Sequence, residues 1–274
     1  MIYEIYGDRK SDVTILAIPA LGERKEFYLP LSKQLNDYRW IVCELPGHNG
    51  YQTKDISINC YLDHLKELLD TLEAAKVHLV GTSIGATIIQ AFYQKYSDVV
   101  HSLFLLDGGY YFLGERQGAE EEMTLQKIEN FEEIKEAVHE FIYSIEGLRQ
   151  QNYEQFEQYF LENYIEAAGY YRHHCDIDSY NALSREVDSI DYCLKKQPDI
   201  PLILLLAENN LDEHATEKIK AFQGRHPLAK VQLIQNGHHY LPLTHTEEIK
   251  NHLKSCIEQY EGDVFGGKSD GEGV

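Results

Sequence analysis

The stretch VHLVGTSIGATIIQAF, residues 77–92, places one serine between two glycines where an apolar run gives way to a helix-like pattern. The apolar run predicts a buried strand, and residues 85–97 predict an amphipathic helix. A serine at such a turn requires a sharp bend, and side chains at Gly81 and Gly85 would collide with the neighbouring strand and helix. We therefore expect the hydroxyl of Ser83 to point out of the sheet at its C-terminal edge, as a nucleophile.

The rest of the chain alternates between short apolar runs and helical patterns. Near-continuous β-branched and leucine runs are typical of strands buried on both faces. The predicted strands are residues 2–6, 13–18, 40–45, 77–81, 102–107, 201–207 and 231–235, and the predicted helices are 25–36, 56–75, 85–97, 213–223 and 245–260. This alternation predicts an α/β fold with a mostly parallel sheet flanked by helices.

Residues 108–198, which we call the cap, interrupt this alternation and contain no clear strand pattern. We interpret the cap as a helical insertion on a core formed by residues 1–107 and 199–260. Residues 261–274 are rich in glycine and acidic residues, and predict a disordered tail. One helical face in the cap is formed by Phe131, Ile134, Val138, Ile142 and Ile145.

The composition excludes several classes of protein. The net charge is −20, which disfavours nucleic-acid binding, and the cap alone holds 19 acidic against 8 basic residues. No apolar run is long enough to span a membrane, and the N-terminus does not resemble a signal peptide. Five scattered cysteines predict reduced thiols in the cytoplasm. No oligomeric state is predicted.

No motif predicts a cofactor. The glycine-rich patterns of nucleotide-binding loops are absent from the sequence. The run His173-His174-Cys175-Asp176 has the residue types of a metal site. Four adjacent residues cannot all reach one ion from a regular element. We therefore interpret the run as surface of the cap and predict no metal.

The serine turn at Ser83 and two loops described next resemble motifs of the α/β-hydrolase superfamily. The resemblance covers about residues 12–260, and the cap is inserted where this family usually has its cap. CELPGHNGY is similar to the family's Asp-x-Pro-Gly-x-Gly-x-Ser loop, and NGHHYLPLTHTEEI is similar to its histidine loop. The family's His-Gly pair is replaced by Pro19-Ala20. The resemblance implies that the backbone amides of Leu21 and Ile84 donate to an oxyanion. At Ile84 the positive end of the helix dipole adds to the stabilisation of the oxyanion.

A serine needs a base within hydrogen-bond reach. The resemblance places His239 in the position of the base, with its neighbour His238 as the alternative. The position of the family's acid is occupied by Asn210, which is neutral. Two carboxylates remain as candidates, Asp107 at the end of the strand after the serine and Asp212 two residues beyond Asn210.

The favoured function is a serine hydrolase that forms an acyl-enzyme on Ser83 and needs no cofactor. Its expected substrate is a small, uncharged ester, lactone or related acyl compound held under the cap. A carbon–carbon bond hydrolase would use the same groups. The alternative is a catalytically weak or inactive binding protein on the same fold, since fold does not fix function. A carboxylate within reach of His239 discriminates between an enzyme and a binding protein.

Overall fold

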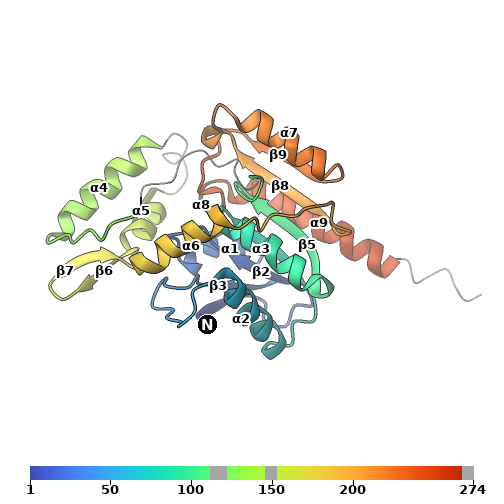
Figure 1. Cartoon of the computed structure of the whole chain (residues 1–274), viewed down its shortest axis with the longest axis horizontal. Coiled ribbons are helices and arrows are strands. Elements are labelled where there is room, and N and C mark those ends of the chain that lie inside the picture. Colours follow the sequence, from blue (N-terminus) through green and yellow to red (C-terminus); the bar gives the residue numbers. More distant parts are fainter. Residues whose placement is uncertain (112–121, 146–152, 267–274) are drawn as a thin grey trace, which may run out of the picture.

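A seven-stranded sheet forms the centre of the computed structural model, which describes residues 1–111, 122–145 and 153–266 (Figure 1). The strand order is β1-β3-β2-β4-β5-β8-β9. Every neighbouring pair is parallel except β1 and β3. The strands are β1 (Tyr3–Gly7), β2 (Thr14–Ile18), β3 (Arg39–Cys43), β4 (Val77–Thr82), β5 (Val100–Leu106), β8 (Leu202–Ala207) and β9 (Lys230–Ile234). The predicted fold class is confirmed, and each strand lies where the sequence predicts it.

Helices cover both faces of this sheet. One hydrophobic core packs the sheet against α2 (Ile58–Thr71), α3 (Ile84–Lys95) and α7 (Ala215–Arg225). The opposite core packs it against α1 (Leu29–Gln34), α8 (Leu241–Thr244) and α9 (Thr246–Gly266). Alternate residues of β2 enter the two cores: Leu16 and Ile18 face the first, and Ile15 and Ala17 face the second. A strand buried on both faces is therefore apolar at every position. Single 3₁₀ turns lie at Lys25–Tyr28, Ser97–Val99 and Glu208–Asn210.

The cap contains a two-stranded hairpin as well as helices. Its described elements are α4 (Phe131–Ser144), α5 (Tyr153–Leu161), β6 (Tyr164–Ala167), β7 (Tyr170–His173) and α6 (Ile177–Ser189). The prediction of an entirely helical cap is wrong for the hairpin, whose four-residue strands are too short to show an alternating pattern. On α4 the predicted apolar face is largely buried, with Ile134, Val138 and Ile142 in the second core.

Helix α9 extends to Gly266, so residues 261–266 are helical where the sequence predicted a disordered tail. The glycine at position 262 does not end the helix, since one glycine costs only about 1 kcal/mol. Residues 267–274 of the predicted tail lie outside the described residues.

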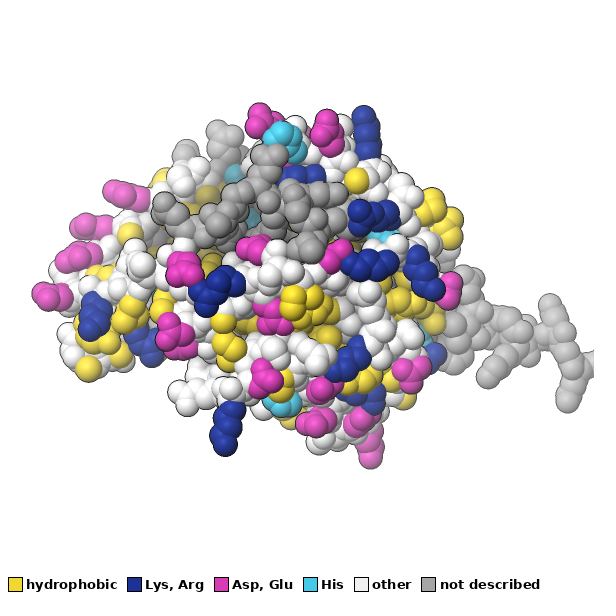
Figure 2. Space-filling view, in the orientation of Figure 1, with side chains coloured by type: hydrophobic (Ala, Val, Ile, Leu, Met, Phe, Trp, Pro, Cys, Tyr) yellow, Lys and Arg dark blue, Asp and Glu magenta, His cyan; other side chains and the backbone are white. Residues whose placement is uncertain are grey.

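Within the described residues, no helix combines the length and the apolar character needed to cross a membrane. Acidic side chains are numerous on the face in Figure 2, including its left end, where α4 and the hairpin lie.

Candidate active site

Ser83 occupies a strained turn between β4 and α3. Its φ is 55° and its ψ is −119°, a conformation that L-residues rarely adopt. The two flanking glycines allow the close approach of neighbouring backbone. A Cβ atom on Gly85 would lie 2.2 Å from the carbonyl oxygen of Ile18 on β2, and one on Gly81 would lie 2.3 Å from the carbonyl oxygen of Gly85. The predicted steric reason for both glycines is thus confirmed.

Asp107 lies directly after β5 and holds the ring of His239. Its Oδ2 atom is 2.6 Å from Nδ1 of His239 and accepts a hydrogen bond of 2.7 Å from Nδ2 of Asn210. Its Oδ1 atom accepts one of 2.9 Å from the backbone N–H of Ala207. The Asp107 side chain is only 2% exposed, whereas that of His239 is 33% exposed. A buried carboxylate thus orients an imidazole that remains open to the cavity.

The other candidates of the sequence have different partners. Asp212 accepts a hydrogen bond of 2.6 Å from Nζ of Lys218, whose side chain is buried. His238 pairs through Nε2 with the side-chain amide of Asn209 at 3.1 Å. The structure therefore places Asp107 beside His239. Asp212, which precedes α7 in the chain, forms a separate ion pair with Lys218 of that helix.

Ser83, Asp107 and His239 line one cavity of about 660 Å³, together with Ile84 and Leu21. Among the described residues, the wall contains several aromatic and acidic side chains and one lysine. These are Tyr111, Phe141, Tyr180, Tyr192, Tyr240, Asp107, Asp188, Asp191, Asp212 and Lys218. The cavity lies between the C-terminal edge of the sheet and the cap, because its lining comes from both.

Ile84 and Leu21, whose backbone amides are the expected oxyanion donors, line the cavity together with Ser83. Ile84 is the first residue of α3, so its N–H has no acceptor within the helix. Leu21 lies in a turn closed by a hydrogen bond of 3.1 Å from the N–H of Glu23 to the carbonyl of Ala20. Gly22 follows Leu21 in this turn with φ of +89°, a position that favours glycine.

Glu23 is a buried acid that the sequence did not single out. Burial raises the pKa of its carboxyl to about 6, and the hydroxyl of Tyr159 and the charge of His239 act in the opposite direction. Tyr159 belongs to α5 of the cap and donates a hydrogen bond to Oε2 of Glu23. No pattern marks this contact, because the two residues are separated by 136 positions in the chain.

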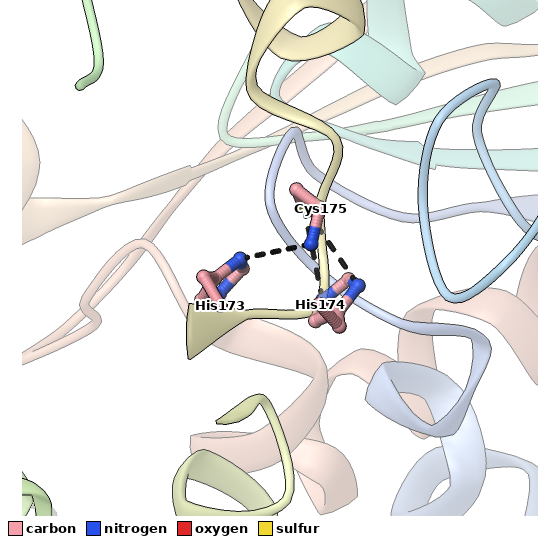
Figure 3. Close-up of side chains that lie close together, drawn as sticks. All are labelled: His173, His174 and Cys175. Atoms are coloured by element: carbon pink, nitrogen blue, oxygen red, sulfur yellow. Dashed lines mark hydrogen bonds between the residues drawn. The ribbon is translucent and has the colours of Figure 1, made fainter. Parts of the chain in front are cut away.

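His173 at the end of β7 and His174 and Cys175 in the turn that follows lie together (Figure 3), with potential metal-ligand atoms within 4.8 Å of one another. Their interpretation as cap surface is wrong for two of them, since His174 is 4% exposed and Cys175 is 1% exposed. Both nitrogens of His174 already bond backbone groups, the N–H of Asn49 and the carbonyl of Gly22. Burial raises the pKa of the Cys175 thiol. A metal would therefore have to displace existing hydrogen bonds.

The geometry provides the groups that acyl transfer needs. A hydroxyl on a strained turn shares a cavity with an imidazole whose Nδ1 faces a buried carboxylate, which leaves Nε2 to exchange protons. Ile84 at a helix N-terminus and Leu21 in a neighbouring turn line the same cavity, and backbone amides at such positions can stabilise negative charge.

Comparisons with known proteins agree with this architecture. In structure the chain is similar to a thioesterase domain from the curacin biosynthetic pathway, with TM-score 0.75 and 14% identity over 92% of this chain and 94% of that one. It is also similar to E-2-(acetamidomethylene)succinate hydrolase, with TM-score 0.72 and 16% identity over 93% and 94%. A thermophilic esterase from Thermogutta terrifontis gives TM-score 0.67 and 18% identity over 94% and 93%. At these identities the likeness shows the fold alone.

The search of curated proteins by sequence gives no match. A family model for the alpha/beta hydrolase fold matches residues 13–168, more than half of the chain. With the strand order, the serine turn and the position of the cap, this match shows that the chain belongs to the α/β-hydrolase fold family.

Proposed function

We propose that the protein is a serine hydrolase of small acyl compounds, with Ser83 as nucleophile, His239 as base and Asp107 as acid. The observation that carries the proposal is the 2.6 Å contact between His239 and Asp107 in the cavity that Ser83 lines. A binding protein has no need of a buried carboxylate aimed at an exposed imidazole. Because Asp212 is paired with Lys218, Asp107 is the acid of choice.

The reaction follows from these positions. Oγ of Ser83 attacks the acyl carbon while Nε2 of His239 takes its proton, and Asp107 stabilises the imidazolium. The amides of Ile84 and Leu21 stabilise the oxyanion. His239 then protonates the leaving group, which departs and leaves an acyl-serine ester. Water, deprotonated by His239, attacks this ester and releases the acid and the free serine.

The cavity favours small substrates without negative charge. Among the lining residues that the structure describes, the acidic side chains outnumber the one lysine, and carboxylates repel an anionic substrate in a confined space. Tyrosine rings on the wall offer apolar contact area for an acyl or alcohol group. We therefore propose short uncharged esters or lactones in preference to acyl-coenzyme A. We also propose a cytoplasmic enzyme, since all five cysteines carry free thiols.

The test is reaction of the full-length protein with a fluorophosphonate probe, followed by mass spectrometry of the labelled peptide. We expect the label on Ser83 in the wild type and none in Ser83→Ala. Hydrolysis of p-nitrophenyl acetate, butyrate and octanoate by the same two proteins reports acyl-chain preference. A folded wild type that neither labels nor hydrolyses any of these esters would overturn the proposal in favour of a binding protein.

A further inference from the structure

The turn that carries Leu21 is held at Gly22 by two histidines from distant parts of the chain. The N–H of Gly22 donates to Nε2 of His48 at 3.0 Å. The carbonyl of Gly22 accepts from Nε2 of His174 at 3.0 Å. His48 belongs to the loop after β3, and His174 belongs to the cap. Both backbone groups of Gly22 are therefore fixed by imidazoles.

The hydrogen bonds of the two rings define opposite tautomers. Nδ1 of His48 faces the carbonyl of Pro46 at 3.0 Å, so Nδ1 carries the proton and Nε2 accepts. Nδ1 of His174 accepts from the N–H of Asn49 at 3.1 Å, so Nε2 carries the proton and donates. Both rings are buried, and burial lowers the pKa of each below its usual value. Each imidazole is therefore neutral in the fold.

These contacts fix three successive peptide planes. The carbonyl of Ala20 accepts from the N–H of Glu23, which orients the plane that also contains the N–H of Leu21. His48 holds the N–H of the next plane, and His174 holds the carbonyl of the third. No plane in the turn can rotate unless it breaks one of these bonds. The plane of the Leu21 N–H is thus held by a backbone hydrogen bond, and the two planes that follow it are held by side chains that do not line the cavity.

The cap binds the residues that follow as well. Tyr159 donates to the carboxylate of Glu23, and Nε of Arg24 donates to Oδ1 of Asn163 at 2.7 Å. Arg24 also donates through a terminal nitrogen to the carbonyl of Tyr159 at 3.1 Å. This part of the cap is therefore joined to the turn by buried polar contacts at three consecutive residues.

We propose that His48 and His174 are positioning residues that hold the Leu21 amide toward the reacting carbonyl, so that the cap builds part of the oxyanion site. The inference rests on the proposed function. A donor fixed in advance acts on the charge that develops in the transition state and less on the bound ester. Loss of either imidazole therefore lowers kcat and leaves KM almost unchanged.

The experiment compares His48→Leu, His174→Leu, His48→Gln and His174→Gln in the full-length protein. Leucine fills the space without a polar atom, whereas the glutamine amide can reach Gly22 with an oxygen at position 48 or an N–H at position 174. His226→Leu is the matched control, because His226 is also fully buried but does not line the cavity. The measurements are kcat and KM for a p-nitrophenyl ester, and hydrogen exchange of the Gly22 amide.

We expect the leucine variants to lower kcat by about 10- to 100-fold, at or below the effect of deleting one oxyanion donor, with KM within about twofold. The glutamine variants recover most of this loss, and His226→Leu keeps the wild-type kcat. His48→Leu also accelerates exchange of the Gly22 amide. If a leucine variant fails to fold, an asparagine variant at the same position takes its place. The asparagine side chain is too short to reach Gly22, so it is compared with the glutamine variant.

Two results would overturn the inference: folded leucine variants with the wild-type kcat, or glutamine variants as slow as the leucine variants. Failure of the proposed function is distinguishable, because then the wild type itself neither labels nor hydrolyses. In that case exchange at Gly22 still reports the hydrogen bond, but its catalytic role is refuted.

Discussion

Nδ2 of Asn210 donates a hydrogen bond of 2.7 Å to Oδ2 of Asp107, the same oxygen that faces the imidazole of His239. Asn210 stands where the family usually has its acid, and it now supports a carboxylate supplied by a different strand. In the proposed triad, the amide of Asn210 therefore supports an acid that lies at the end of β5.

Asp107→Asn should lower kcat of the proposed hydrolase by about 10³- to 10⁴-fold, because a neutral amide does not stabilise the imidazolium and favours the wrong tautomer. Asp212→Asn is the matched control and should retain kcat within about tenfold, since Asp212 pairs with Lys218. Steady-state kinetics and the rate of labelling by the fluorophosphonate probe measure both. A larger loss in Asp212→Asn than in Asp107→Asn would assign the acid to position 212.

Exchange of the two side chains should restore part of the lost activity. Nδ2 of Asn210 lies 3.3 Å from Nδ1 of His239, so a carboxylate at position 210 can reach the same ring. We expect Asp107→Asn with Asn210→Asp to exceed Asp107→Asn alone by about tenfold or more in kcat. Asn210→Asp alone places two carboxylates in contact, and one of them must hold a proton. A double variant that folds but is inactive would show that a carboxylate can act on His239 only from position 107, directly after β5.

Gly85→Ala should destabilise the fold, because its Cβ would lie 2.2 Å from the carbonyl oxygen of Ile18 and backbone must shift. The expected loss is about 1–3 kcal/mol in the free energy of unfolding, as for other overpacked sites. Gly224→Ala in α7 is the control, because a Cβ there meets no atom within 4 Å and alanine gains up to about 1 kcal/mol in a helix. Urea unfolding of both variants measures the difference, and equal midpoints would contradict the close packing of β2 on α3.

The carboxyl of Glu23 should stabilise the fold at low pH and should lose this effect as the pH rises. This is the reverse of acid denaturation, in which stability is lost as the pH falls. Burial raises its pKa in the fold to about 6 from a usual value of 4.5. The folded state therefore binds the proton more tightly, and this stabilisation is lost as the pH rises through 6.

Glu23→Gln removes that dependence. Relative to this variant, the wild type should lose roughly 1 kcal/mol of unfolding free energy between pH 5 and pH 7.5. Chemical denaturation of the two proteins at both pH values gives the comparison. If the two proteins differ in unfolding free energy by the same amount at both pH values, the carboxyl of Glu23 does not have a raised pKa in the fold.

The sequence predicted the central strands well because they are buried on both faces and therefore read as nearly continuous apolar runs, as residues 15–18 of β2 do, whereas the edge strands β1 and β9 are more exposed. The turn at Ser83 was equally clear, since Gly85 marks the close approach of Ile18 and Gly81 marks that of the first turn of α3. The β6–β7 hairpin was missed because its half-buried residues neither alternate nor form a long run.

The contacts of the candidate site were harder to predict than its residue types. Asp107 and Asp212 both lie near the end of a strand, and only the fold shows that Lys218 occupies the second. The bond between His174 and Gly22 joins positions 152 residues apart, and no local pattern encodes such a pairing. Residues close in sequence were thus predictable, whereas partners brought together by the cap were not.

The strand order determines which strand edge stays unpaired while the protein is being synthesised. In the sheet β8 lies between β5 and β9, yet in the chain it follows the whole cap, residues 108–198. While the cap is being synthesised, one edge of the apolar strand β5 has unpaired N–H and C=O groups. Such an edge pairs readily with other nascent chains. Synthesis that stalls within the cap should therefore yield aggregates, whereas a pause after β9 leaves a complete sheet in which β5 is paired on both edges.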